Sequence, residues 1–130
     1  TASDADYVVK VIDVYPNFDQ TNFRMSGYQL PVTMEVFRGR FRKSFEKPEP
    51  FIANQPEEIA IDLHQVNHIF LKGHKIMIQV QSTWFPIIDR NPQKFVPSIF
   101  EANDDDFVKA THTIYSNNVL ASYVELPVLK

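Results

Sequence analysis

The chain has 130 residues, a formal net charge of −3 at pH 7 and no cysteine. This length is that of one domain able to bury a core, and the acidic balance argues against a general nucleic-acid binder. The lack of cysteine excludes disulfides, thiol catalysis and cysteine-ligated zinc but leaves the compartment open, cytoplasmic or exported. No apolar run approaches the ~18 residues of a membrane span, so no membrane partner is expected.

Two segments in the first third of the chain predict β-strands. Residues 7–15 are β-branched or aromatic almost throughout, which is typical of a central strand covered on both faces. Residues 28–37 alternate between apolar and polar side chains, which indicates a strand with one buried face. Pro31 places this second strand at a sheet edge or a bulge, because proline lacks the amide donor that a central strand needs.

Residues 38–51 form the most charged stretch, in which basic and aromatic side chains are interleaved. Such interleaving can bind single-stranded nucleic acid, but the acidic overall balance works against that function. We therefore expect a long loop whose phenylalanines contact the core and whose arginines pair with carboxylates.

A further strand is predicted over residues 57–63, and histidines follow it. His64 and His68 would share one face of a helix and could ligate zinc together with His74. The zinc-protease motif needs glutamate after its first histidine, however, and this chain has Gln65 there. We interpret the histidines as hydrogen-bonding residues of a turn, and we expect neither a metal nor a cofactor.

The stretch from residue 72 to residue 97 combines a strand with an apolar loop. Alternation over residues 75–82 predicts a half-buried strand. Trp84, Phe85 and Pro86 then begin an apolar run that three prolines keep out of regular structure. Large apolar side chains in a loop need a burial partner. This loop therefore either folds onto its own domain or docks against another one.

The last third of the chain predicts a capped turn and two strands. The acidic residues 101–106 lack the spacing of an EF-hand, and Asn103 or Asp104 could cap a short helical turn there. Residues 109–115 and 122–129 resemble two strands separated by a polar turn. Five or six strands without a long helix predict an all-β sandwich of the jelly-roll type.

Catalytic motifs are missing from the chain. None of its three glycines brackets a serine in the Gly-x-Ser-x-Gly motif of α/β-hydrolases, and no phosphate-binding glycine loop is present. A triad could be assembled on paper around His112, but triads are recognised by geometry. We expect the chain alone to be inactive.

Several motifs, in one order, resemble the C-terminal domain of the X-Pro dipeptidyl-peptidase and cocaine esterase family of serine hydrolases. The nearest match is the branch of α-amino acid ester hydrolases and glutaryl cephalosporin acylase-like proteins. The motifs are Val-Lys-Val-Ile-Asp-Val-Tyr (9–15), Glu-Val-Phe-Arg-Gly-Arg-Phe-Arg (35–42), Ser-Phe-Glu-Lys-Pro-Glu-Pro (44–50), Lys-Gly-His (72–74), Gln-Ser-Thr-Trp-Phe-Pro (81–86) and Asp-Arg-Asn-Pro (89–92). They cover nearly the whole chain.

The resemblance implies a galactose-binding-domain-like jelly roll attached behind a catalytic α/β-hydrolase domain of the same polypeptide. In that family a Ser-His-Asp triad on the hydrolase domain cleaves esters or amides through an acyl-enzyme, and none of the triad positions has a counterpart here. The resemblance also implies that the first strands of the domain lie upstream of Thr1. The isolated chain would then self-associate through its open sheet edges or through the loop that carries Trp84.

We therefore expect a non-catalytic domain that packs on the catalytic domain and helps to shape its active-site cleft. The residues expected to dock are Trp84, Phe85 and Pro86. The residues expected to fix the two long loops through ion pairs are Arg38, Arg40, Asp89 and Arg90. The alternative is a carbohydrate-binding module, in which Trp84 or a tyrosine would stack on a sugar ring.

Overall fold

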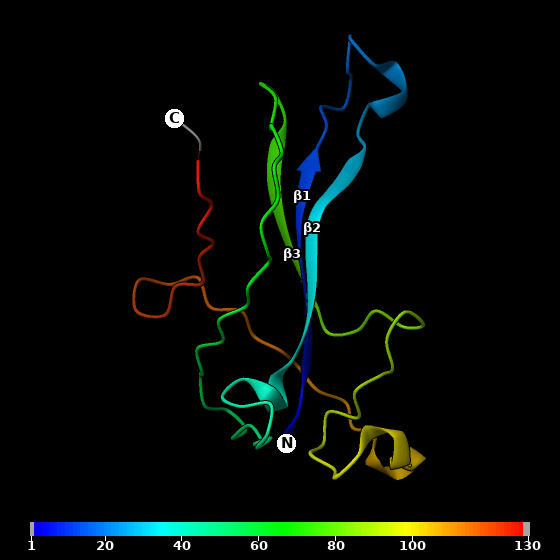
Figure 1. Cartoon of the computed structure of the whole chain (residues 1–130), viewed down its shortest axis with the longest axis vertical. Coiled ribbons are helices and arrows are strands. Elements are labelled where there is room, and N and C mark those ends of the chain that lie inside the picture. The colour runs from blue at the N-terminus through cyan, green and yellow to red at the C-terminus, as the bar shows by residue number, and fades with distance from the viewer. Residues whose placement is uncertain (1, 129–130) are drawn as a thin grey trace.

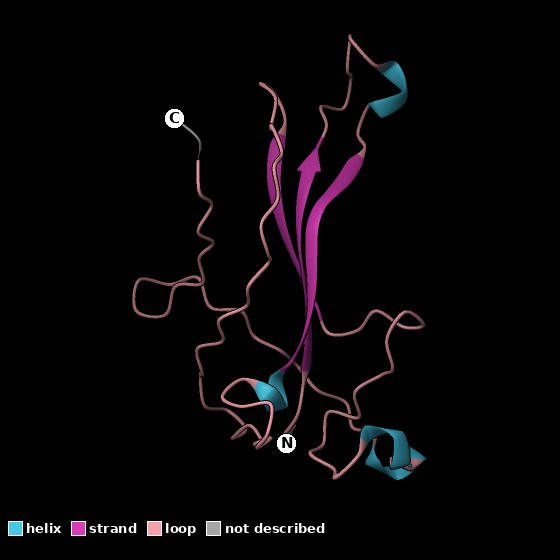
Figure 2. Ribbon diagram, viewed as in Figure 1, coloured by secondary structure: helices cyan, strands magenta, loops and turns pink. Residues whose placement is uncertain are grey.

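The computed structural model describes residues 2–128 and is mostly β and irregular. Its one sheet is antiparallel and has three strands, β1 (Asp6–Val14), β2 (Gln29–Arg38) and β3 (Lys75–Gln81), in the spatial order β2-β1-β3 (Figures 1 and 2). The helical elements are single 3-10 turns, η1 (Phe23–Met25), η2 (Gly39–Phe41), η3 (Ile99–Glu101) and η4 (Asp104–Asp106). No helix in this part of the chain is long and apolar enough to cross a membrane.

Strand β1 lies at the centre of the sheet, which confirms the prediction of a central strand. It pairs with β2 on one side and with β3 on the other. Val8, Val11 and Ile12 are almost completely buried. β-branched side chains suit this position because they pack well on both faces of a pleated sheet.

Strand β2 is an edge strand with a bulge, as Pro31 predicts. Ile12 of β1 lies opposite Pro31 whereas Val11 lies opposite Thr33, so Val32 is an extra residue on β2. An edge strand tolerates proline because the amide that it lacks would not have to join a second ladder.

The N-terminal segment ties the long loops to one end of the sheet. The amide of Ser3 donates to the carbonyl of Gln93 at 3.0 Å, and the amide of Phe51 donates to the carbonyl of Ser3 at 2.9 Å. Gly39 donates to the carbonyl of Ala5 at 2.8 Å. A Cβ atom on Gly39 would collide with the Phe51 ring and would lie 2.8 Å from the Ala5 carbonyl oxygen, so the close approach requires glycine here.

Three predicted strands are wrong for this structure. Residues 57–63, 109–115 and the described part of 122–129 form no β-ladder, and Leu129 itself lies outside the described residues. Residues 59–63 do keep the predicted alternation, since every second side chain is half-buried. A ladder also needs a neighbouring backbone that pairs along the whole segment. Among the described residues, pairing between the last two segments is limited to their connecting turn, where the amide of Ser122 donates to the carbonyl of Tyr115 at 2.9 Å and Ser116 and Ala121 form an isolated bridge.

A capped helical turn does form in the acidic stretch, as predicted. The turn η4 begins after Asn103, whose amide donates to the Asp106 carboxylate at 3.1 Å. The same carboxylate accepts a hydrogen bond from the Lys94 ammonium at 2.6 Å. Acidic residues in a first turn are favoured by the partial positive charge of its free amides.

Part of one sheet face is open. Val9 and Val11 of β1 are buried, but Val80 and Ile78, which lie directly opposite them on β3, are 40% and 37% exposed. Residues 63–68 cross the same face over β1 and β2, where the Thr33 hydroxyl donates to the Leu63 carbonyl and His68 bonds Asp13. Residues 63–68 do not cover β3, so its apolar side chains on this face remain exposed.

The chain exposes more surface than a self-contained protein of its mass. Its accessible surface is 10182 Å². A folded monomer of 15.1 kDa is expected to expose about 7,100 Å². The excess of about 3,000 Å² means that much of the apolar surface lacks a burial partner within the chain.

Candidate docking surface

The loop after β3 is held by hydrogen bonds and presents apolar side chains outward. The amide of Ile87 donates to the carbonyl of Trp84 at 2.8 Å, and the amide of Phe85 donates to the Thr83 hydroxyl at 3.3 Å. Phe85 and Ile87 are nevertheless 63% and 69% exposed. A fixed loop with exposed apolar tips is suited to contact with another surface.

The three predicted docking residues are not equivalent. Trp84 is half-buried, and the Lys10 ammonium of β1 lies 4.6 Å from the centroid of its ring. A cation over an aromatic face is a favourable contact, so one side of Trp84 belongs to its own domain. Phe85 and Pro86 are exposed and point the loop outward.

Two of the four arginine and aspartate residues predicted to fix the loops lie near buried carboxylates. The Arg40 Nε donates to Asp4 Oδ2 at 2.9 Å, and its Nη2 donates to the carbonyl of Val96 at 2.7 Å. Both charged side chains are almost fully buried. Arg38 Nε lies 3.8 Å from Asp6 Oδ2. Arg40 thus joins the N-terminal segment to residue 96 of the loop after β3.

Asp6 is a buried carboxyl with incomplete hydrogen bonding. Its Oδ1 accepts a bond from the Asn91 amide at 2.9 Å, whereas its Oδ2 has no hydrogen-bond partner among the described residues. Burial raises the pKa of Asp6, and the Asn91 hydrogen bond and the Arg38 charge oppose that shift. The bond to Asp6 holds Asn91, and with it the backbone of the 89–92 motif, against the sheet.

The other two predicted loop-fixing residues, Asp89 and Arg90, make no ion pair within residues 2–128. The Arg90 guanidinium is exposed and lies 5.7 Å from the ring centroid of Phe85 and 5.4 Å from that of Phe107. The predicted pairing does not form inside this part of the chain because Arg90 meets aromatic rings there and no carboxylate.

The set of predicted site residues omits an arginine that organises the first long loop. The Arg42 Nε donates to Glu57 at 2.7 Å, and its two Nη atoms donate to the carbonyls of Gly39, Glu49 and Pro50. A guanidinium can do this because it offers five donors in a rigid fork. The signal was present in the sequence, since Arg42 belongs to the same basic run as Arg40.

The three neighbouring histidines bind carboxylates. His64 Nε2 lies 2.6 Å from Glu35, and His68 Nε2 and His74 Nδ1 lie 2.9 and 2.8 Å from the two oxygens of buried Asp13. Within residues 2–128, no group of three or more acidic or histidine side chains is arranged to hold a metal ion. Each of the three imidazoles thus makes a hydrogen bond to a carboxylate, as they were interpreted to do from the sequence.

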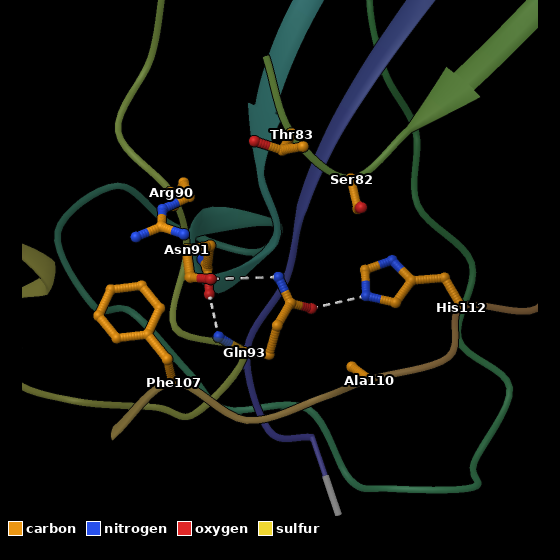
Figure 3. Close-up of a pocket in the computed structure, with 8 residues that line it drawn as sticks. All are labelled: Ser82, Thr83, Arg90, Asn91, Gln93, Phe107, Ala110 and His112. Carbon is orange, nitrogen blue, oxygen red and sulfur yellow. Dashed lines mark hydrogen bonds between the residues drawn. The ribbon is translucent and has the colours of Figure 1, made fainter. Parts of the chain in front are cut away.

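A hollow of about 240 Å³ opens beside the loop that follows β3 (Figure 3). The Gln93 Oε1 accepts a hydrogen bond from His112 Nε2 at 2.7 Å, and the Gln93 amide nitrogen lies 3.4 Å from the Asn91 carbonyl. His112 is therefore paired with an amide, and among residues 2–128 no hydrogen bond joins its Nε2 to a serine or an aspartate. The residues that line the hollow are Ser82, Thr83, Arg90, Asn91, Gln93, Phe107, Ala110 and His112.

Burial lowers the pKa of His112 below its ordinary value of 6.5. As the pH falls through about 6.5, the unfolded chain binds a proton at this residue and the folded chain does not. The folded state should therefore lose stability as the pH decreases through that window. We expect the His112 imidazole to titrate below 6.5 in an NMR experiment in which His112→Gln identifies its resonance. A titration midpoint at or above 6.5 would contradict the lowered pKa of His112.

Comparison with known proteins points to one family. The model of the X-Pro dipeptidyl-peptidase C-terminal non-catalytic domain matches residues 1–125. The cocaine esterase of Rhodococcus sp. (strain MB1 Bresler) is 29% identical over all 130 residues of the chain, which span 21% of that protein.

Two solved structures share the fold of the chain. An α-amino acid ester hydrolase superposes with a TM-score of 0.79 at 50% identity, over 82% of this chain and 17% of the hydrolase. An aminopeptidase from a marine sediment archaeon, Thaumarchaeota archaeon, superposes with a TM-score of 0.79 at 48% identity, over 82% of this chain and 17% of the other. The chain spans about a fifth of the length of these proteins. It belongs to the family of X-Pro dipeptidyl-peptidase C-terminal non-catalytic domains.

Proposed function

We propose that this chain is part of a jelly-roll domain that packs on the catalytic α/β-hydrolase domain of the same polypeptide and helps to shape its active-site cleft. The observation that carries the proposal is the outward apolar loop, with Phe85 and Ile87 more than half exposed although hydrogen bonds fix their backbone. The family supports it, because its members are the non-catalytic C-terminal domains of such enzymes.

The exposed area is large enough for two kinds of contact. A stable interface buries about 800 Å² on each partner, and the excess surface of the chain is about 3,000 Å². We infer that upstream strands of the jelly roll cover the open face and the outer edge of β3, and that the 84–88 loop meets the catalytic domain. The same open edge supports self-association of the isolated chain.

The chemistry belongs to the proposed catalytic domain. The names of the similar proteins, an esterase, an amino acid ester hydrolase and an aminopeptidase, suggest hydrolysis of an acyl or aminoacyl ester or amide. In the described part of this chain His112 is hydrogen-bonded to Gln93 and to no serine, so it does not act as a base that activates a serine nucleophile. A carbohydrate-binding role has less support, because Lys10 already occupies one face of the Trp84 ring.

We expect the 130-residue chain to remain unlabelled by a fluorophosphonate probe, since serine labelling requires an activated hydroxyl. The full-length polypeptide should be labelled at one serine that lies outside the chain, as mass spectrometry of tryptic peptides would show. A glycan array run on the same two samples provides the control for the sugar-binding alternative. Stoichiometric labelling of any serine within residues 1–130 would overturn the non-catalytic role.

A further inference from the structure

Arg90 is a positioned cation without an anionic partner in the described residues. Its guanidinium lies against the rings of Phe85 and Phe107 at 5.7 and 5.4 Å from their centroids. The next residue, Asn91, is buried and bonded to Asp6, which anchors the backbone that carries the arginine. The two rings restrict where the guanidinium can lie, and its planar fork is pre-organised, so less freedom is lost for each hydrogen bond that it forms.

The hollow beside Arg90 offers donors and no negative charge. No aspartate or glutamate is among its lining residues. Thr83 Oγ1 accepts from the Phe85 amide, which leaves the hydroxyl hydrogen of Thr83 free to donate. Ser82 also lines the hollow, and Figure 3 shows its hydroxyl directed into it. Arg90 and these hydroxyls line the same hollow, and such a set of donors is complementary to a carboxylate.

Arg90 lies next to the exposed tip of the proposed docking loop. Phe85 forms that tip, and its ring is one of the two that lie against the Arg90 guanidinium. A surface that covers Phe85 would therefore also cover Arg90. Burial of an unpaired guanidinium is strongly unfavourable, so the covering surface must supply acceptors, and a carboxylate, which can accept two parallel hydrogen bonds and neutralise the charge, is the strongest of these. We propose that Arg90 receives an aspartate or glutamate side chain of the catalytic domain when the 84–88 loop docks. This inference rests on the proposed function.

The test uses the full-length polypeptide with Arg90→Glu, Arg90→Gln and Arg90→Lys. The matched control is Arg24→Glu, which changes the charge equally at an exposed arginine of η1, at the tip of the β1–β2 connection (Figure 1). The readout is the rate at which hydroxyl radicals oxidise the Phe85 ring, measured by mass spectrometry. Circular dichroism verifies that each variant is folded.

We expect Phe85 to be protected in the wild-type polypeptide and in Arg24→Glu. Arg90→Glu should raise its oxidation rate by roughly tenfold or more, because it places two like charges at the contact. Arg90→Gln should have a smaller effect, and Arg90→Lys should retain part of the protection. An acidic-to-arginine substitution in the catalytic domain that restores protection to Arg90→Glu would identify the partner.

The failures of the two proposals are distinguishable. If Phe85 is oxidised as fast in the wild-type polypeptide as in the isolated chain, the loop does not dock and both proposals fall. If Phe85 is protected in wild type and Arg90→Glu behaves like Arg24→Glu, docking stands and the carboxylate contact is refuted. Equal effects of Arg90→Glu and Arg90→Gln would show that the contact depends on packing and would refute the charge pairing.

Discussion

Replacing Arg40 by methionine should lower the free energy of unfolding by about 3–5 kcal/mol, because removal of one partner of a buried ion pair leaves an uncompensated charge. Arg40 and Asp4 are almost fully buried, with 2.9 Å between the guanidinium and the carboxylate. The carbonyl of Val96 would also lose its donor. Urea denaturation of wild type and variant at one protein concentration measures the difference.

Two further variants show whether the loss of stability comes from the buried charge or from any substitution of a charged residue in this loop. Lys43 lies in the same loop and pairs with Glu49 at 3.1 Å, but both side chains are exposed, so Lys43→Met should cost about 1 kcal/mol or less. The double variant Asp4→Leu with Arg40→Met should be less destabilised than Arg40→Met alone, since neither charge is left unpaired. If Arg40→Met cost no more than Lys43→Met, the buried pair would not fix the loops.

The three strands of the sheet were predictable because their side-chain pattern and their pairing agree. β1, β2 and β3 begin and end within about one residue of the predicted bounds, and the bulge at Val32 lies next to Pro31. Residues 57–63 carry the same alternating pattern and still form no ladder. Alternation reports which side chains are buried, whereas a strand also requires a neighbouring backbone that local sequence does not reveal.

Part of the proposed docking surface followed from the sequence. An apolar run among prolines predicted a loop in need of a burial partner, and Phe85 does point outward and is 63% exposed among the described residues. The partners of the arginines did not follow. Asp4 and Asp6 are buried carboxyls at the start of the chain, where acidic residues ordinarily indicate solvent exposure. Only the fold brings them to Arg40 and Arg38.

The contact of Arg90 with two rings was equally invisible in the sequence. Phe107 lies seventeen positions further along the chain, and nothing in the local pattern of the 89–92 motif indicates that an aromatic ring rather than a carboxylate lies beside its arginine. An arginine can pair with either kind of group. Local sequence therefore identified the residue but left the identity of its partner open.

The proposed docking of this domain on the rest of the polypeptide can be tested by comparing hydroxyl-radical oxidation of the isolated chain with that of the full-length polypeptide. We expect strong protection in the full-length form of the exposed side chains of the loop, Phe85 and Ile87, and of the open β3 face, Ile76 and Ile78. Phe18 and Phe23, at the far end of the sheet, are exposed as well and serve as internal controls whose oxidation should not change (Figure 1).

Oxidation of β3 reports on cover by upstream strands, whereas oxidation of the 84–88 loop reports on contact with the catalytic domain. Protection of the loop together with β3 would agree with a domain that is completed by upstream strands and packed on its catalytic partner. Protection of β3 alone would mean that upstream strands cover the sheet but that the catalytic domain contacts a surface other than the 84–88 loop. If Phe85 and Ile87 were oxidised at the same rate in both forms, at equal radical dose and with unchanged controls, the loop would be free in the intact polypeptide and the account would be contradicted.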